Sequence, residues 1–132
     1  GIFAVVFDLR ELVSYSATAD AQRYLKFWIR SIGLHSPDAP LILVGTFSDE
    51  VADKVKVANE ILRTTIGDTK KSRLVFNGSL LFFPIDNHSK TGIRKLQNVL
   101  GQLAQRSALL RQEVSIKWMA LLDEIIEMSE TK

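Results

Sequence analysis

The sequence predicts an α/β protein with a doubly wound, mostly parallel sheet flanked by helices. Three short apolar runs, residues 2–8, 41–45 and 80–86, are rich in Val, Ile, Leu and Phe, which is typical of strands buried on both faces. Stretches with apolar residues at helical spacing lie between and after these runs. Strands that alternate with helices form right-handed βαβ units around a parallel sheet.

The spacing of apolar residues predicts a helix after each strand and a further helix at the end. The first helix would be capped by Thr18 or Asp20 and would end at Gly33. The second would begin after Ser48-Asp49 and end near Gly67. In the first helix the apolar face consists of Ala21, Tyr24, Leu25, Trp28 and Ile32. In the third it consists of Ile93, Leu96, Val99, Leu100, Leu103 and Leu110. In the last it consists of Val114, Trp118, Leu121, Ile125 and Met128.

A turn is expected ahead of the third strand. The Asn77-Gly78 pair lies between two apolar runs, which is a strong signal for a tight hairpin. The third strand would therefore follow a short antiparallel partner.

The composition is that of an ordinary globular chain. Its 132 residues suit one domain, with 46% hydrophobic and 24% charged residues. The net charge of +2 is too small to indicate nucleic acid, and no apolar run approaches the ~18 residues that span a bilayer. The absence of cysteine excludes disulfides, thiolate metal sites and a cysteine nucleophile. Because the chain opens on a strand without Met or a charged leader, we expect it to be a piece of something longer.

A carboxylate lies at or just after the end of each predicted strand, and these are Asp8, Asp49 and Asp86. Ligands of open α/β sheets bind outside the carboxyl ends of the strands. For Asp8 and Asp86 the simpler interpretation is an acid that favours the positive end of a helix. Asp49 differs, because Gly45 ends the strand and Thr-x-Ser-Asp then precedes a helix. In that layout a carboxylate can accept two parallel hydrogen bonds from a purine edge.

Other chemistries fit less well. His35 and His88 are far apart in sequence and not at metal-ligand spacing, which favours solvated loop histidines. The three aspartates could bind Mg²⁺ as in a receiver domain, but such a domain would have an acidic pair after an early strand, which this sequence lacks.

Several segments, in order along the chain, resemble one family. Val44-Gly45-Thr46-Phe47-Ser48-Asp49 is similar to the guanine-specificity motif of Ras-like GTPases, in its Thr-His-x-Asp variant. Ser89-Lys90-Thr91-Gly92 is similar to the loop that closes over the base. Residues 5–10, 25–29, 82–87 and 114–118 add further matches. Together the segments resemble the C-terminal half of the Roc (Ras of complex proteins) GTPase domain of the Roco family, running into the COR segment that follows it.

This resemblance implies both a domain plan and a ligand. Residues 1–112 would be the C-terminal portion of a Ras-like (P-loop NTPase) domain, and residues 113–132 would begin a helical COR segment. The ligand would be GTP or GDP, with Mg²⁺ in the intact parent. The parent would be a cytoplasmic GTPase in which the nucleotide switches a COR-mediated dimer.

The resemblance also assigns roles to individual residues. Asp49 would accept hydrogen bonds from the guanine N1 and N2 groups, Ser89 and Lys90 would line the base, and Thr46 would tie the two loops together. Phe47 stands where the family has Lys or His, and its ring could stack on the purine or pack inward. No catalytic residue or metal ligand is expected in this chain.

The sequence departs from the family in its phosphate-binding parts. No Gly-x-x-x-x-Gly-Lys-Ser/Thr and no Asp-x-x-Gly occurs, so only the base-recognition half is present. The chain alone is therefore not expected to hydrolyse GTP or bind it tightly. The alternative is a non-catalytic interaction or dimerisation module with a degenerate GTPase-like fold. In the resembling fold a neighbour of strand 2–8 comes from the missing N-terminal half, so here that edge would be open and would promote self-association.

Overall fold

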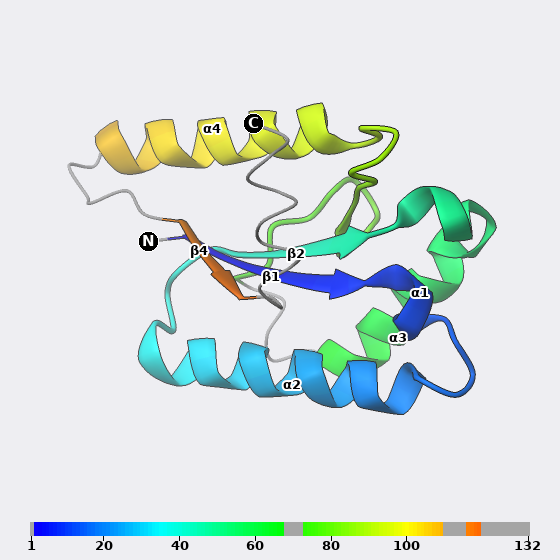
Figure 1. Cartoon of the computed structure of the whole chain (residues 1–132). Coiled ribbons are helices and arrows are strands. Elements are labelled where there is room, and N and C mark those ends of the chain that lie inside the picture. The colour runs from blue at the N-terminus through cyan, green and yellow to red at the C-terminus, as the bar shows by residue number, and fades with distance from the viewer. Residues whose placement is uncertain (1, 68–72, 110–115, 120–132) are drawn as a thin grey trace.

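The computed structural model describes residues 2–67, 73–109 and 116–119 (Figure 1). They form a four-stranded sheet in the order β3-β2-β1-β4, in which every pair of neighbours is parallel. The strands are β1 (Ile2–Asp8), β2 (Leu41–Thr46), β3 (Phe83–Pro84) and β4 (Ile116–Met119). The helices are α1 (Leu9–Leu12), α2 (Thr18–His35), the 3₁₀ helix η1 (Ser48–Lys54), α3 (Val55–Ile66) and α4 (Ile93–Leu109). The expected α/β class with a parallel, helix-flanked sheet is confirmed.

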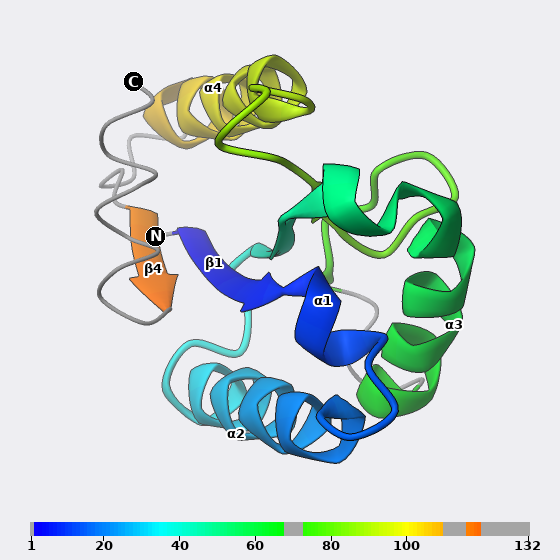
Figure 2. The ribbon, with the colours of Figure 1, turned by 45° about the vertical axis from the view of Figure 1, so that its right-hand side comes forward.

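The helices cover both faces of the sheet. The chain steps from β1 to β2 to β3 in one direction, and α2 and α3 lie on one face (Figures 1 and 2). After β3 it returns to the far side of β1, and α4 lies on the opposite face. Right-handed crossovers require this change of face when the direction of travel reverses.

The side chains of β1 alternate between two apolar clusters. Phe3, Val5 and Phe7 belong to the cluster under α2 and α3. The alternate residues, Ile2, Ala4 and Val6, belong to the cluster under α4. This follows from the two-residue period of a strand, and it explains why the run carries no polar face.

The ends of α2 differ from the prediction. The helix begins at Thr18, but the Thr18 hydroxyl donates to the Leu12 carbonyl at 2.8 Å and no side chain caps the helix. Gly33 does not end the helix, which continues to His35. The sequence reason is Pro37, since a proline disfavours helical backbone at the residue before it, and Ser36 leaves the helical region there.

The turn at Asn77-Gly78 is confirmed, whereas the third strand is shorter than expected. Asn77 and Leu80 exchange backbone hydrogen bonds of 2.9 and 3.0 Å, and Gly78 has a φ of 61°. The antiparallel partner is reduced to this one bridge, and β3 covers only two residues of the predicted run 80–86.

The predicted last helix over residues 114–128 is wrong at Ile116–Met119, which form β4. This strand pairs parallel with β1, from Ile2 opposite Ile116 to Val5 opposite Met119. The remainder of the predicted helix lies outside the described residues.

An apolar strand with one free edge offers unpaired backbone groups, and an Ile-Lys-Trp-Met segment suits a strand as well as a helix. The edge of β1 is therefore not open, and the expected self-association loses its structural basis.

We predict that the whole chain sediments as a monomer, because β4 occupies the edge through which β1 strands would pair. A chain that ends before Ile116 should associate in a concentration-dependent manner. A matched chain that ends after Met119 keeps β4 and should remain monomeric. Sedimentation velocity over a range of concentrations measures all three, and a dimer of the whole chain would contradict the prediction.

Candidate functional site

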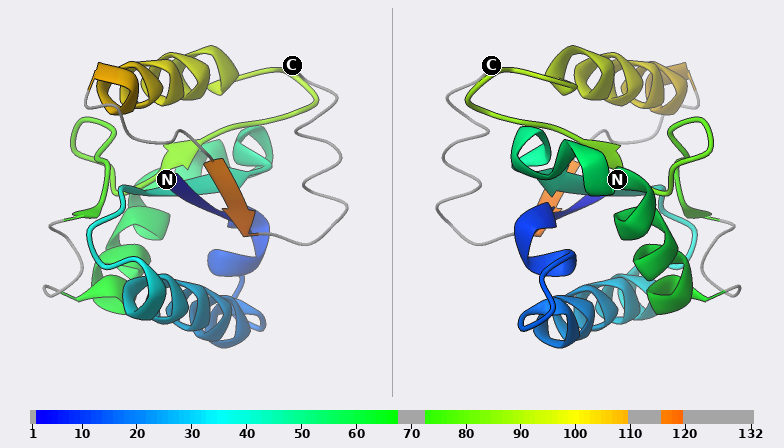
Figure 3. Two further views of the ribbon diagram at one scale, coloured as in Figure 1. Left: turned by 90° about the vertical axis from the view of Figure 1, so that its left-hand side faces the viewer. Right: turned by 90° about the vertical axis from the view of Figure 1, so that its right-hand side faces the viewer.

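The loops that follow β1, β2 and β3 lie at one end of the sheet. Figure 3 (right) looks onto this end, where α1 and η1 begin. Because the strands are parallel, their carboxyl ends meet here, as the sequence predicted.

Hydrogen bonds join the end of β2 and the loop after it to the loop after β3. The Ile85 N–H donates to the Gly45 carbonyl at 2.8 Å, and the Ser48 N–H donates to the Ile85 carbonyl at 3.0 Å. The Asp49 N–H donates to Asp86 Oδ2 at 3.2 Å. These bonds make the two loops one unit, so Asp49 and the segment 86–91 are held at a fixed separation.

Asp86 organises the second loop. Its side chain is buried and its Oδ1 accepts from the backbone N–H groups of His88 at 3.0 Å and Ser89 at 3.2 Å. The simpler interpretation, that Asp86 is an acid at the start of a helix, is wrong, because α4 begins only at Ile93. Asp8, by contrast, is the N-cap of α1 and accepts from the Arg10 N–H at 2.8 Å.

The structure brings Asp49 and the Ser89-Thr91 pair together. The Thr91 hydroxyl is 3.4 Å from Asp49 Oδ2, and the Ser89 and Thr91 hydroxyl oxygens are 2.8 Å apart. All three side chains are exposed, as is Lys90, whose φ is 68°. Thr91 was not singled out from the sequence as a site residue, although it lies inside the Ser-Lys-Thr-Gly segment.

Phe47 is half-buried, and an arginine lies over one face of its ring. Its backbone is left-handed, with a φ of 61°, and the Arg10 guanidinium lies 3.6 Å from the centre of its ring. Arg10 also forms ion pairs with Asp8 at 2.8 Å and Glu50 at 3.6 Å. The hydrogen bond to Asp8 raises the pKa of Arg10. Sequence reasoning missed Arg10, because its contact with Phe47 joins two different strand ends.

Thr46 does not tie the two loops, which corrects its expected role. Its hydroxyl is buried and donates to the Phe7 carbonyl of β1 at 3.1 Å. The bonds of Ser48, Asp49 and Thr91 described above join the loops instead. The Ser48 hydroxyl is buried in the same region and has no hydrogen-bond partner among the described residues.

Within the described part of the chain, no group of three or more His, Asp or Glu side chains is placed to hold a metal ion. Asp8, Asp49 and Asp86 thus do not form the Mg²⁺ cluster considered from the sequence. None of the described helices is both long enough and apolar enough to cross a bilayer.

No family model matches this chain, and neither the curated proteins nor the solved structures contain a match.

We predict that Asp86→Asn weakens the joined loops, because one acceptor oxygen is replaced by an amide that faces backbone donors. A loss of about 2 kcal/mol in the free energy of unfolding is expected. Denaturant unfolding measures it, and faster hydrogen exchange at Asp49, His88 and Ser89 would locate the effect. Asp53→Asn, an exposed change of the same kind, is the control and should change stability little.

We also predict that Gly92→Ala is destabilising. Gly92 has a φ of 76°, and an added Cβ would lie 2.1 Å from the Pro84 carbonyl oxygen. Both effects oppose a side chain, and a loss of about 2 kcal/mol or more is expected. Gly101→Ala is the matched control, since this site in α4 has open space and should gain up to about 1 kcal/mol. Equal stability of the two variants would contradict the tight approach of Gly92 to β3.

Proposed function

We propose that the joined loops at the carboxyl end of the sheet recognise the base of a guanine nucleotide, in a protein of the Roco GTPase type. The observation that carries the proposal is the tie between the two loops, which sets the Asp49 carboxylate beside Thr91 and the Ser89 hydroxyl. A base-binding site of this kind needs two hydrogen-bond acceptor oxygens on one loop and side chains from the other loop that contact the base.

Each residue of the proposed site would make a different contact with the nucleotide. Asp49 would accept from the guanine N1 and N2 groups with its two oxygens. Ser89 and Lys90 would line the base from the second loop. The Arg10 guanidinium lies over the Phe47 ring at the start of the first loop, and a purine would stack on the other face of that ring. The phosphates and Mg²⁺ would be bound by parts that this sequence lacks.

The alternative function, a non-catalytic interaction module with a GTPase-like fold, is favoured by a different observation. In the resembling fold, β1 has a neighbour that comes from the N-terminal half. Here that side of β1 is taken by β4 of the same chain. A sheet in which the same chain supplies this neighbour of β1 does not require a strand from the phosphate-binding half.

A titration with three diphosphates separates the two functions. We expect GDP to bind weakly and shift the backbone amide signals of Asp49, Ser89 and Lys90 in the ¹⁵N-labelled chain, and ADP to shift them less. Asp49→Asn should move the preference from GDP toward XDP, because one acceptor becomes a donor. Asp53→Asn, with the same loss of charge on an exposed site, should keep the preference for GDP.

Equal shifts with GDP and ADP would contradict guanine recognition and favour the interaction module. We further expect calorimetry to find no tight, Mg²⁺-dependent GTP binding, since phosphate-loop amides and a Lys supply most of that affinity in this fold. Sub-micromolar binding would show that this chain holds phosphate by other means.

A further inference from the structure

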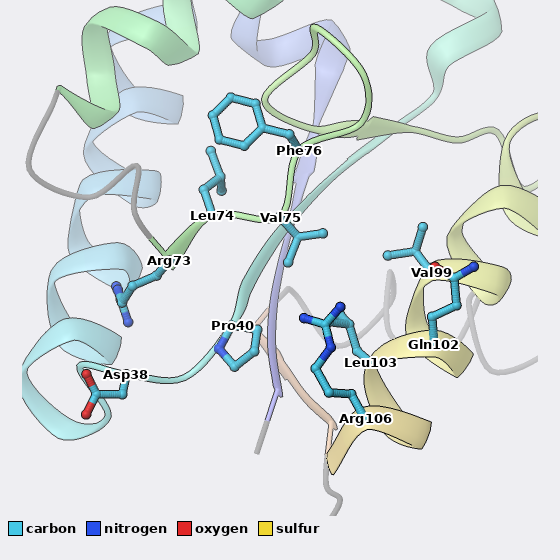
Figure 4. Close-up of a pocket in the computed structure, with 10 residues that line it drawn as sticks. All are labelled: Asp38, Pro40, Arg73, Leu74, Val75, Phe76, Val99, Gln102, Leu103 and Arg106. Carbon is cyan, nitrogen blue, oxygen red and sulfur yellow. The ribbon is translucent and has the colours of Figure 1, made fainter. Parts of the chain in front are cut away.

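A groove of about 470 Å³ lies at the amino end of the sheet, between α4, the loop before β2 and the segment 73–76 (Figure 4). Arg73 and Arg106 both line it. Figure 4 shows their side chains on opposite sides of Pro40, and Arg73 Nη1 donates to the Ser36 carbonyl at 3.1 Å. The two guanidinium groups therefore do not converge on one ligand group.

The outer side of α2 carries two large apolar side chains in contact with solvent. Phe27 is 62% exposed and Leu34 is 76% exposed. The two residues are seven positions apart, which is about two helical turns, so they lie on the same side of the helix. The buried residues Leu25 and Ile32 lie on the opposite side, which packs into the core. Figure 1 shows α2 as the lower layer of the molecule, so its outer side faces away from the sheet.

Basic side chains accompany these apolar residues. Arg23, Lys26 and Arg30 are exposed, and at 3.6 residues per turn they lie with Phe27 and Leu34 within about 100° of the helix circumference. We call these five residues the α2 face. The one acid in α2 is Asp20, which forms an ion pair with Arg23. The α2 face therefore combines exposed apolar surface with a net positive charge.

A hollow of about 340 Å³ lies beside the α2 face, between α2 and α3. Lys26 and Arg30 line it, and the other lining residues are Ile29, Thr65 and Ile66. Gln22 Nε2 donates to Thr65 Oγ1 at 2.9 Å, which attaches α2 to α3 at this hollow. Its volume is large enough for one lipid head group, and two cations of the α2 face are at hand to neutralise that group.

We propose that the α2 face binds the surface of an anionic membrane. Phe27 and Leu34 enter the boundary between head groups and acyl chains, and Arg23, Lys26 and Arg30 lie against the anionic head groups. Apolar and basic residues combined on one side of a helix are typical of helices that lie in the membrane interface. A membrane accommodates side chains that project from a convex helix, whereas the anchors of protein interfaces fill pockets. The α2 face contains no residue of the joined loops, so this proposal is independent of guanine recognition.

The test measures binding of the whole chain to vesicles by sedimentation. One set of vesicles contains phosphatidylcholine with phosphatidylserine, and the other contains phosphatidylcholine alone. We expect a partition coefficient at least about tenfold higher on the anionic vesicles, because each exposed cation near such a surface contributes about 1 kcal/mol. The difference should shrink as the salt concentration rises. Equal binding to both sets, or no binding to the anionic set, would overturn the proposal.

Variants locate the binding surface. Arg30→Gln should weaken partitioning to anionic vesicles about fivefold. Leu34→Gln tests the apolar part, because Phe27 also contacts the Trp28 ring, and should weaken partitioning by about fivefold or more. Lys95→Gln removes an exposed cation of α4, on the opposite face of the sheet, and should have little effect.

Two outcomes with these variants would contradict the proposal. An equal loss with Lys95→Gln and Arg30→Gln would reveal unspecific attraction. Unchanged partitioning of Leu34→Gln would show that the apolar side chain does not enter the membrane. All three substituted residues are exposed, so thermal unfolding should confirm that each variant folds as the unmodified chain does.

Discussion

The need to bury both faces and both edges of β1 is the constraint on which the rest of the structure depends. Its residues Ile2–Phe7 are buried, and it pairs with β2 on one side and β4 on the other. A strand without a polar face must be covered by helices from above and below. Right-handed connections can supply both covers only if the chain reverses its direction across the sheet, and it does so between β3 and β4.

The same arrangement decides where chemistry can occur. Parallel strands bring their carboxyl ends to one edge, and the loops that follow must satisfy their own backbone groups there. The Asp86 carboxylate satisfies several of these backbone groups, because it accepts hydrogen bonds from N–H groups of both loops. A buried carboxylate used in this way is unavailable for a ligand, whereas Asp49 beside it is exposed and has only the Thr91 hydroxyl, at 3.4 Å, as a side-chain contact among the described residues. The division between a supporting acid and an exposed acid is the basis of the proposed base site.

The two ends of the sheet differ in charge and in construction. At the carboxyl end Arg10 forms ion pairs with Asp8 and Glu50, and Asp49 is exposed nearby on the loop after β2. The amino end carries Arg73 and Arg106 with one acid, on a frame fixed by β2 and α4. The proposed base site lies at the carboxyl end.

Local pattern was enough to predict much of this protein from sequence. The apolar runs, the helical stripes and the Asn77-Gly78 turn each depend on near neighbours, and they predicted the parallel α/β class and the position of Asp49 at a strand end. Contacts between distant segments were decided only by the tertiary structure. The segment Ile116–Met119 suits either a strand or a helix, and the free edge of β1 selects the strand. Likewise Arg10 meets Phe47, Thr46 bonds to Phe7, and Arg73 and Arg106 share a groove because packing brings separate elements together. No spacing along the chain encodes such meetings, since they depend on the order of the strands across the sheet.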